Sequence, residues 1–318
     1  NAKGLNPVVA CELEFYLLNK RKNISDPPTP LDGTPDAQNY DLEVLSRSES
    51  LLRAIQAASH IVGLPIDTMI AEFGPGQFEI NFHHTADVLA AADTAILFRR
   101  IVRGVAAEHN MEATFMAKPY ASHPGNGMHL HASVLDEKGE NIFNASDDKI
   151  APTLRHAVAG VLNTMNEFQA IFAPHLNSYR RFFLGGFAPC APDWGIDNRN
   201  AGIRLPEING SSARLEHRIC GADVNPYLAF AAILAGVLHG IEAQEEPPLP
   251  LEDKNALPAV PLTTNWALSV ENFATSDLAA KVFGKSYRDI YTILRRDEIA
   301  QLTAEISPIE YKTYLSRL

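Results

Sequence analysis

The chain has 318 residues, of which 46% are hydrophobic and 20% are charged, so its composition is that of a globular protein with a substantial core. The formal net charge of −11 argues against nucleic acid or an anionic membrane as the main partner. Three cysteines, Cys11, Cys190 and Cys220, lie far apart without a C-x-x-C motif, which favours reduced thiols in the cytoplasm over a disulfide framework.

The N-terminal half is predicted to mix strands, helices and polar loops. The expected elements are a strand over residues 6–18, a polar loop over 19–39, an amphipathic helix over 45–63, two strands within 67–84 that meet at a Gly-Pro-Gly turn, and a helix whose N-cap is Thr85. An apolar stripe follows Thr85 and marks the buried face of that helix.

The C-terminal half continues the mixture. The expected elements are a strand, a Pro/Gly loop and a second strand within 113–135, a helix over 147–172, short strands and loops over 177–223, a helix capped by Asn225, a Pro-rich connection over 245–261, and a helical tail with a capping box at Ser307 and Glu310.

This order has no regular βαβ alternation. It predicts an α+β fold with a curved, mainly antiparallel sheet flanked by helices, and residues 1–318 form a single domain. We expect no membrane-spanning helix and no signal peptide, because no run is long and apolar enough and the N-terminus lacks the charge pattern. The chain opens almost directly on a strand and without Met, so we expect it to be a fragment of a longer protein.

The first predicted strand carries two carboxylates. Glu12 and Glu14 share one face, because side chains two apart point the same way. Two adjacent carboxylates in a half-buried strand repel each other and lose solvation. A cation, a basic partner or an edge open to water would each relieve that cost, and by itself a solvated edge is the more common case.

Further carboxylates and imidazoles follow. Glu72 and Glu79 lie on either side of the Gly-Pro-Gly turn, which can bring them together. His129 and His131 share a face of a later strand, directly after a Gly-rich loop. Taken alone, the glutamate pair fits a β-hairpin with two surface carboxylates equally well. For the histidine pair alone, two histidines with structural hydrogen bonds are the more common case.

Arginines complete the pattern, because Arg is suited to bidentate binding of carboxylate and phosphate. Arg181, Arg199 and Arg204 lie in loops, where surface ion pairing is the alternative. Arg214 and Arg218 lie on either side of Glu216 in the stretch ARLEHR, where a structural ion-pair ladder is the alternative. Carboxylates suit Mg²⁺ or Mn²⁺, and cations combined with arginines suit phosphoryl transfer. The chain has neither a Walker-type P-loop nor a kinase signature.

Seven motifs in order give a specific resemblance. They are E-x-E, E-x-x-x-G-Q-x-E, G-M-H-x-H, N-S-Y-x-R, N-R-x-x-x-x-R-x-P, R-x-E-x-R and N-P-Y-L. From about Pro7 to its end the chain resembles the catalytic domain of the glutamine synthetase family. In that family ATP phosphorylates the γ-carboxylate of L-glutamate, and an amine then displaces the phosphate.

The resemblance implies two sites for Mg²⁺ or Mn²⁺. One would use Glu14, Glu72 and Glu79, and the other Glu12, His129 and Glu216. Each carboxylate of the first strand would then face a different cation.

The resemblance also implies roles for the other polar residues. His131, Ser133 and Arg204 would contact ATP. Arg199 and Arg214 would bind its phosphates. Arg181, Arg218 and Gly125 would lie at the glutamate and its transferred phosphoryl group, and Arg181 and Arg199 would be the catalytic arginines.

Two departures concern the amine. In ammonia-using members a flap, here residues 181–194, carries a glutamate that accepts a proton from ammonium, but the aligned residue is Phe187. Pro124 stands where those members have an asparagine. Both features resemble the gamma-glutamylputrescine synthetase branch, so a polyamine such as putrescine is the favoured acceptor. The alternatives are an ammonia-using glutamine synthetase and a non-catalytic scaffold or regulator, which the presence of all six candidate metal ligands disfavours.

The resemblance finally implies a partner arrangement. The small N-terminal β-grasp domain of the family is absent from this chain. In the full-length protein it would complete the active site of a neighbour in a ring-shaped homo-oligomer, such as a dodecamer.

Overall fold

The computed structural model describes residues 4–31, 40–145, 149–183 and 185–317. Its strands are β1 (Asn6–Asn19), β2 (Ile66–Ala71), β3 (Gln77–Phe82), β4 (Met111–Thr114), β5 (Met128–Leu135), β6 (Trp194–Ile196), β7 (Ile203–Glu207) and β8 (Arg214–His217). They form one sheet in the order β2-β3-β1-β5-β8-β7-β6, and β4 pairs with the far end of β1. All these pairs are antiparallel except β6 with β7, which confirms the predicted fold class.

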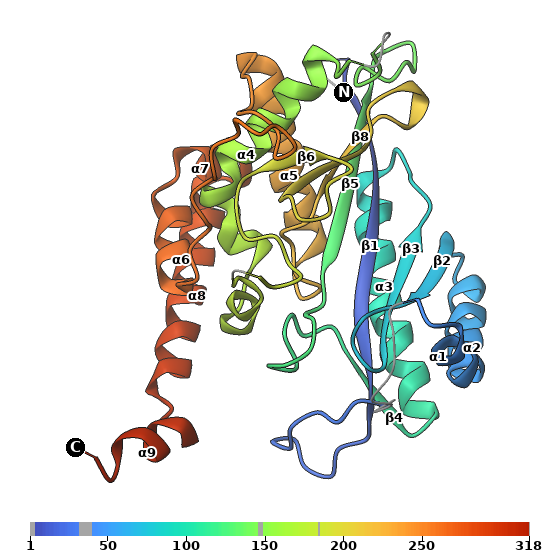
Figure 1. Cartoon of the computed structure of the whole chain (residues 1–318), viewed down its shortest axis with the longest axis vertical. Coiled ribbons are helices and arrows are strands. Elements are labelled where there is room, and N and C mark those ends of the chain that lie inside the picture. The colour runs from blue at the N-terminus through green and yellow to red at the C-terminus, as the bar shows by residue number, and fades with distance from the viewer. Residues whose placement is uncertain (1–3, 32–39, 146–148, 184, 318) are drawn as a thin grey trace.

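Helices lie on either side of this sheet. They are α1 (Leu42–Arg47), α2 (Glu49–Ile61), α3 (Val88–Glu108), α4 (Pro152–Phe172), α5 (Pro226–Ala243), α6 (Trp266–Thr275), α7 (Asp277–Phe283), α8 (Lys285–Ala304) and α9 (Pro308–Tyr314). Figure 1 shows α1 to α3 beside β1, β2 and β3, and α4 to α8 gathered at the opposite side. The C-terminal α9 extends away from the rest of the chain.

Strand β1 organises the molecule because its two faces differ. Val9, Cys11, Leu13 and Phe15 are buried, whereas the positions between them are only partly buried. The Phe15 ring packs edge-on against Phe98 of α3 at a centroid distance of 5.9 Å. Burying each large apolar side chain contributes about 1.5–3 kcal/mol. The apolar face of β1 therefore fixes the sheet on α3, and Glu12 and Glu14 must lie on the other face.

Two predicted helix starts need correction. Asp87, not Thr85, caps α3, because its carboxylate accepts a hydrogen bond from the Ala90 amide at 3.0 Å. Thr85 pairs with Val9 of β1, and its hydroxyl accepts from the Asp87 amide at 3.1 Å. The helix expected from residue 147 begins at Pro152, whose fixed φ suits a first helical turn; residues 146–148 lie outside the described part.

The helix predicted over 45–63 is two helices. Asp41 caps α1 through the Glu43 amide, and the chain leaves helical geometry at Ser48 before α2 begins. The predicted stop at Gly63 agrees with its positive φ of 74°. The other expected caps, Asn225 on α5 and the box of Ser307 with Glu310 on α9, are confirmed.

Helix α5 corrects the expectation that no run could span a membrane. Its 18 residues, with a mean hydropathy of 1.4, are long and apolar enough for that by composition alone. The helix instead packs against α4 inside the domain. At this contact a Cβ on Gly240 would lie 2.0 Å from the His156 carbonyl oxygen, and one on Gly160 would lie 2.2 Å from the Gly236 carbonyl oxygen. The two helices therefore touch backbone to backbone, and the apolar surface of α5 belongs to the core.

Candidate active site

Neighbouring strands bring the predicted acidic and imidazole residues together. Glu12 stands opposite His129 of β5 in the ladder, and Glu14 stands opposite Glu79 of β3. Glu12 bonds to both histidines, with 3.0 Å from its Oε2 to His129 Nδ1 and 3.0 Å from its Oε1 to His131 Nε2. The central position of β1, between β3 and β5, thus places residues far apart in sequence around one point.

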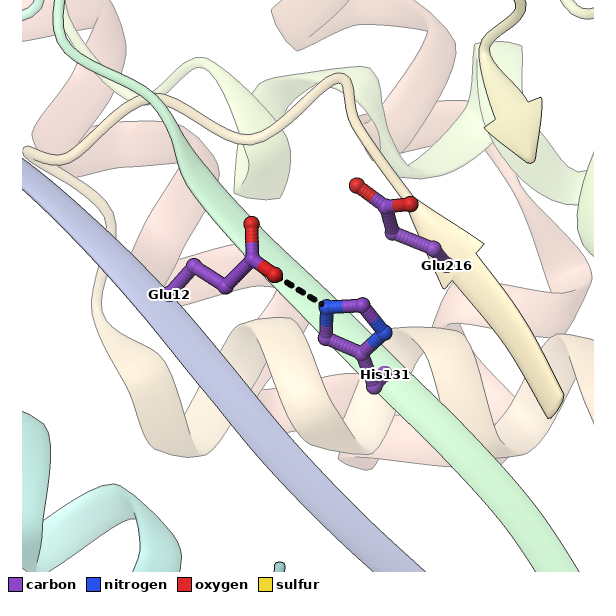
Figure 2. A group of neighbouring side chains, drawn as sticks. All are labelled: Glu12, His131 and Glu216. Carbon is purple, nitrogen blue, oxygen red and sulfur yellow. Dashed lines mark hydrogen bonds and ion pairs between the residues drawn. The ribbon is translucent and has the colours of Figure 1, made fainter. Parts of the chain in front are cut away.

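Glu216 enters from β8 on the other side of β5. None of its side chain is exposed, and it pairs with Arg204 at 2.9 Å and with Arg218. Its Oε1 lies 3.6 Å from His129 Nδ1. Figure 2 shows Glu12, His131 and Glu216 side by side, each from a different strand. Glu216, the glutamate of the stretch ARLEHR, therefore pairs with two arginines and also belongs to the cluster of carboxylates and imidazoles.

The turn between β2 and β3 positions Glu72 and Glu79. Gly74 is required there because a Cβ would lie 1.9 Å from the Tyr16 hydroxyl oxygen. The Gln77 amide accepts from the Gly74 N–H and donates to the Gly125 carbonyl, both at 3.0 Å. Gln77 thus ties this turn to the Gly-rich loop that precedes β5.

The charged carboxylates in this cluster repel one another. Burial, with the charges of Glu12, Glu14 and Glu72, raises the pKa of Glu79 to about 9. Burial and the charge of Glu14 raise the pKa of Glu72 to about 7. Burial acts to raise the pKa of Glu12 as well, but hydrogen bonds from the two histidines outweigh it and hold that pKa well below its usual range. A bound cation would relieve the repulsion that raises the first two.

Two groups have ligand atoms close enough to share an ion. The ligand atoms lie within 4.8 Å of one another in Glu12, Glu79 and His129, and also in Glu12, His131 and Glu216. The predicted sets differ in detail, since they place Glu79 with Glu14 and Glu72. Glu14 itself accepts a hydrogen bond from the Gly127 amide at 2.6 Å. It also lines a cavity that it shares with Glu12, Glu79 and His129. The two predicted ligand sets remain predictions. Five of the six residues line this cavity, and the sixth, Glu216, pairs with two arginines that line it.

The cavity has a volume of about 490 Å³ and gathers most of the predicted site. The predicted residues that line it are Glu12, Glu14, Glu72, Glu79, Gly125, His129, Arg181, Phe187, Arg199, Arg204 and Arg218. Arg181 is buried and donates to the Ile219 carbonyl at 2.8 Å. Four arginines therefore face the carboxylates across one space, as binding of an anion together with cations requires.

The predicted nucleotide residues divide between two hollows. His131, Ser133 and Arg214 line an adjoining groove of about 720 Å³, whereas Arg199 and Arg204 line the first cavity. Arg214 Nε lies 3.3 Å from His131 Nδ1. Glu12 lines both hollows, so they meet at this carboxylate.

The structure adds residues that the sequence analysis missed. Tyr40 accepts a hydrogen bond from Arg199 Nη1 at 2.9 Å, and Phe73 contacts Phe187. Tyr40 stands at the end of a polar loop, where no pattern points to the site. Phe73 directly follows Glu72, and an exposed aromatic next to a candidate ligand was a signal that could have been used.

Comparisons with known proteins agree with this geometry. The family described as "Glutamine synthetase, catalytic domain" matches residues 1–314. The chain is 37% identical to gamma-glutamylputrescine synthetase PuuA of Escherichia coli, across 98% of the chain and 68% of that protein. It is 34% identical to a glutamine synthetase of Mycolicibacterium smegmatis (98% and 72%) and 36% identical to gamma-glutamylethanolamide synthetase GlnA4 of Streptomyces coelicolor (99% and 68%).

A solved structure titled "GmaS/ADP complex-Conformation 1" superposes with a TM-score of 0.87 and 29% identity, covering 99% of the chain and 74% of that structure. Together, the fold, the carboxylate–arginine cavity and these relatives define an ATP-dependent carbon–nitrogen ligase that makes γ-glutamyl amides. The chain belongs to the glutamine synthetase family, whose members use ATP and divalent metal ions.

Proposed function

We propose that this chain joins the γ-carboxylate of L-glutamate to an amine larger than ammonia, with a polyamine such as putrescine as the favoured acceptor. The observation that carries the proposal is Phe187, which lines the cavity of carboxylates and arginines. A phenyl ring cannot accept a proton from ammonium, but it packs well against an alkyl chain. The names of PuuA and GlnA4 support the same class of acceptor.

The acidic cluster fits divalent cations. Glu12, Glu14, Glu72, Glu79 and Glu216, with His129, would hold Mg²⁺ or Mn²⁺, since oxygen-rich sets suit these ions. Cations held by these residues would supply positive charge that stabilises phosphate groups. The raised pKa values of Glu72 and Glu79 support this fit, because they come from burial of these carboxylates and from their crowding against one another.

The arginines would bind the anionic groups of glutamate and ATP. Arg181 and Arg218 would hold glutamate and stabilise the charge that develops on the transferred phosphoryl group, next to Gly125. Arg199 would bind the phosphates of ATP with Arg214, and Tyr40 orients its guanidinium. His131, Ser133 and Arg204 would contact the rest of the nucleotide.

The acceptor amine would enter beside Phe187. It must attack the phosphorylated γ-carboxylate as a neutral amine, with loss of a proton and departure of phosphate. Because Phe187 takes no proton, we propose that this flap excludes water and packs against the amine instead. The full-length protein would act as a ring-shaped homo-oligomer of the family type.

The test is phosphate release by the full-length protein with glutamate, ATP and Mg²⁺. Ammonium, ethanolamine, putrescine and spermidine are compared by kcat/KM. We expect a larger amine to exceed ammonium by at least tenfold, which corresponds to about 1.4 kcal/mol of transition-state binding. A higher kcat/KM for ammonium would assign the chain to the ammonia-using enzymes. Nucleotide binding without turnover of any amine would indicate a regulatory protein.

A further inference from the structure

Phe73 is an aromatic residue that the roles above leave unexplained. It lies in the turn between β2 and β3, directly after Glu72, and half of it (50%) is exposed. Phe187 of the flap is 62% exposed. Aromatic side chains this exposed bury little area in the chain itself, so they contribute little to folding. Their position therefore calls for a reason other than packing.

The two rings contact each other across the chain. Their centroids are 4.9 Å apart, and their planes are inclined by 47°. The residues are more than a hundred positions apart, and both line the 490 Å³ cavity. The flap around Phe187 also contributes Gly186, Ala188 and Pro189, which are small or rigid and carry no charge. One side of an otherwise charged cavity is therefore apolar and aromatic.

The chemistry beside these rings defines what can bind there. Glu72 directly precedes one ring, and Glu14 and Glu79 line the same cavity. The distal ammonium of a diamine gains from nearby carboxylates and from ring faces through cation–π attraction. A methylene stem gains from burial against the rings, by about fourfold in affinity for each CH₂. Ammonium has no stem, so the two rings give it no such gain.

We propose that Phe73 and Phe187 together form the acceptor-amine wall of this site, and that Phe73 is a specificity-determining residue for amines with an alkyl stem. This inference rests on the proposed function and adds to it a second residue, from an element separate from the flap. The stem lies against both rings, and an amine too small to reach them is discriminated against. Removal of either ring opens the wall, so the effects of the two removals are not independent.

The flap provides a matched control. Phe183 has a similar exposure, 47%, but its ring faces the Lys118 ammonium at 5.3 Å and lines a different groove. An alanine at position 183 removes the same atoms from the flap but leaves both rings of the proposed wall in place. Comparison of Phe73→Ala with Phe183→Ala therefore separates a specific effect from general loss of aromatic surface.

The experiment measures kcat/KM for ammonium, ethanolamine and putrescine in the full-length wild type, Phe73→Ala, Phe73→Leu, Phe187→Ala, the double alanine variant and Phe183→Ala. We expect Phe73→Ala to lower the putrescine value about tenfold or more, as loss of contact with two methylenes predicts. The ammonium value should stay within about twofold, because ammonium does not touch the wall. Phe73→Leu should retain most of the activity, and the double variant should lose less than the product of the single losses.

Two results would overturn the inference. One is an equal loss for ammonium and putrescine in Phe73→Ala, which would mean that the residue only supports the fold. The other is a Phe73→Ala variant whose ratio of kcat/KM for putrescine to kcat/KM for ammonium equals that of the wild type, with the KM for ATP and the melting temperature also unchanged. If the wild type itself prefers ammonium, the proposed function fails and the inference fails with it. If the wild type prefers the larger amines but Phe73→Ala does not alter that preference, only the wall is wrong.

Discussion

Glu216 is a fully buried carboxylate that has charged partners on two sides. Arg204 pairs with its Oε2, whereas Arg218 and His129 both approach its Oε1. Burial acts to raise its pKa, but Arg218 and His129 outweigh burial, so the pKa lies below the usual value. The carboxylate therefore stays ionised inside the protein and holds two arginines that face the cavity.

We expect Glu216→Gln to reduce the free energy of unfolding by about 3 kcal/mol in metal-free buffer, because two partly buried arginines then face a neutral amide. Urea denaturation monitored by circular dichroism measures the change. The matched control is Glu271→Gln. Glu271 accepts two hydrogen bonds from Arg296, at 2.8 and 2.6 Å, but lies at the surface, so its loss should cost less than about 1 kcal/mol. Equal losses would contradict the buried-pair interpretation.

At the residue scale, sequence patterns predicted which side chains gather, but not how they pair. The spacing of Glu12 with Glu14 and of His129 with His131 predicts shared faces, and both pairs do meet at one place. The bond from Glu12 to His131 was not predictable, since it depends on the register of β1 against β5. Tyr40 was missed because its contact with Arg199 joins two loops with no periodic pattern.

At the scale of elements, the contact between α4 and α5 depends on glycine. A Cβ at Gly240 would lie 2.0 Å from a backbone oxygen of α4, whereas a Cβ at Gly104 of α3 would meet nothing within 4 Å. We therefore expect Gly240→Ala to destabilise the protein by more than about 3 kcal/mol, because backbone cannot yield as a side chain can. Gly104→Ala should stabilise it by about 0.5–1 kcal/mol through helix propensity. Thermal and urea unfolding of the two variants would show shifts of opposite sign, and a mild effect at Gly240 would mean that the helices can separate.

The cap of α3 allows a second test. Asp87→Ala should cost about 1 kcal/mol, because the Ala90 amide loses its acceptor at the helix start. Asp87→Asn should cost only a few tenths, since Asn caps nearly as well. The urea midpoints of the two variants measure these losses in stability. Similar losses in both would point to the charge of Asp87 rather than to its cap.

The boundaries of helices are the features of these elements that sequence patterns could not predict. Thr85 and Asp87 are both good caps, and the sequence offers no reason to choose between them. Pairing of Thr85 with Val9 decides the choice, and this is a contact with a strand distant in sequence. The break at Ser48 is similar, because an apolar pattern continues through it. The fold class, by contrast, was predictable, since it depends on the order of elements and not on their boundaries.

For the whole molecule, crowded carboxylates make stability depend on pH and on cations. In the folded state the pKa of Glu72 is about 7 and that of Glu79 about 9, both above the ordinary value of 4.5. Through these two groups the folded protein binds more protons than the unfolded chain between about pH 4.5 and pH 9, so their contribution to stability falls as pH rises through that window. Burial lowers the pKa of His217 from 6.5 to about 3, which partly offsets them below pH 6.5. Glu12 and Glu216, whose pKa values are lowered, act only at lower pH.

We expect the free energy of unfolding of the EDTA-treated protein to decrease from pH 5 to pH 9. Addition of Mn²⁺ at 100 times its dissociation constant should restore about 2.7 kcal/mol, since the ion binds the folded state. Urea titrations at several pH values, with EDTA or Mn²⁺, measure both effects. Glu79→Gln should flatten the pH dependence. A pH-independent stability in EDTA would show that the carboxylates are not crowded in solution.

The positions of Phe73 and Phe187 bear on how such an enzyme can change during evolution. The acidic ligands on β1, β3 and β8 stand in strand ladders, where a slip of one residue would turn each to the opposite face. The two rings stand in a turn and in a loop, outside every ladder. Substitutions there leave strand register unchanged. On the proposal that the two rings form the acceptor-amine wall, variation at these positions would change the accepted amine while the residues proposed to activate glutamate stay in place.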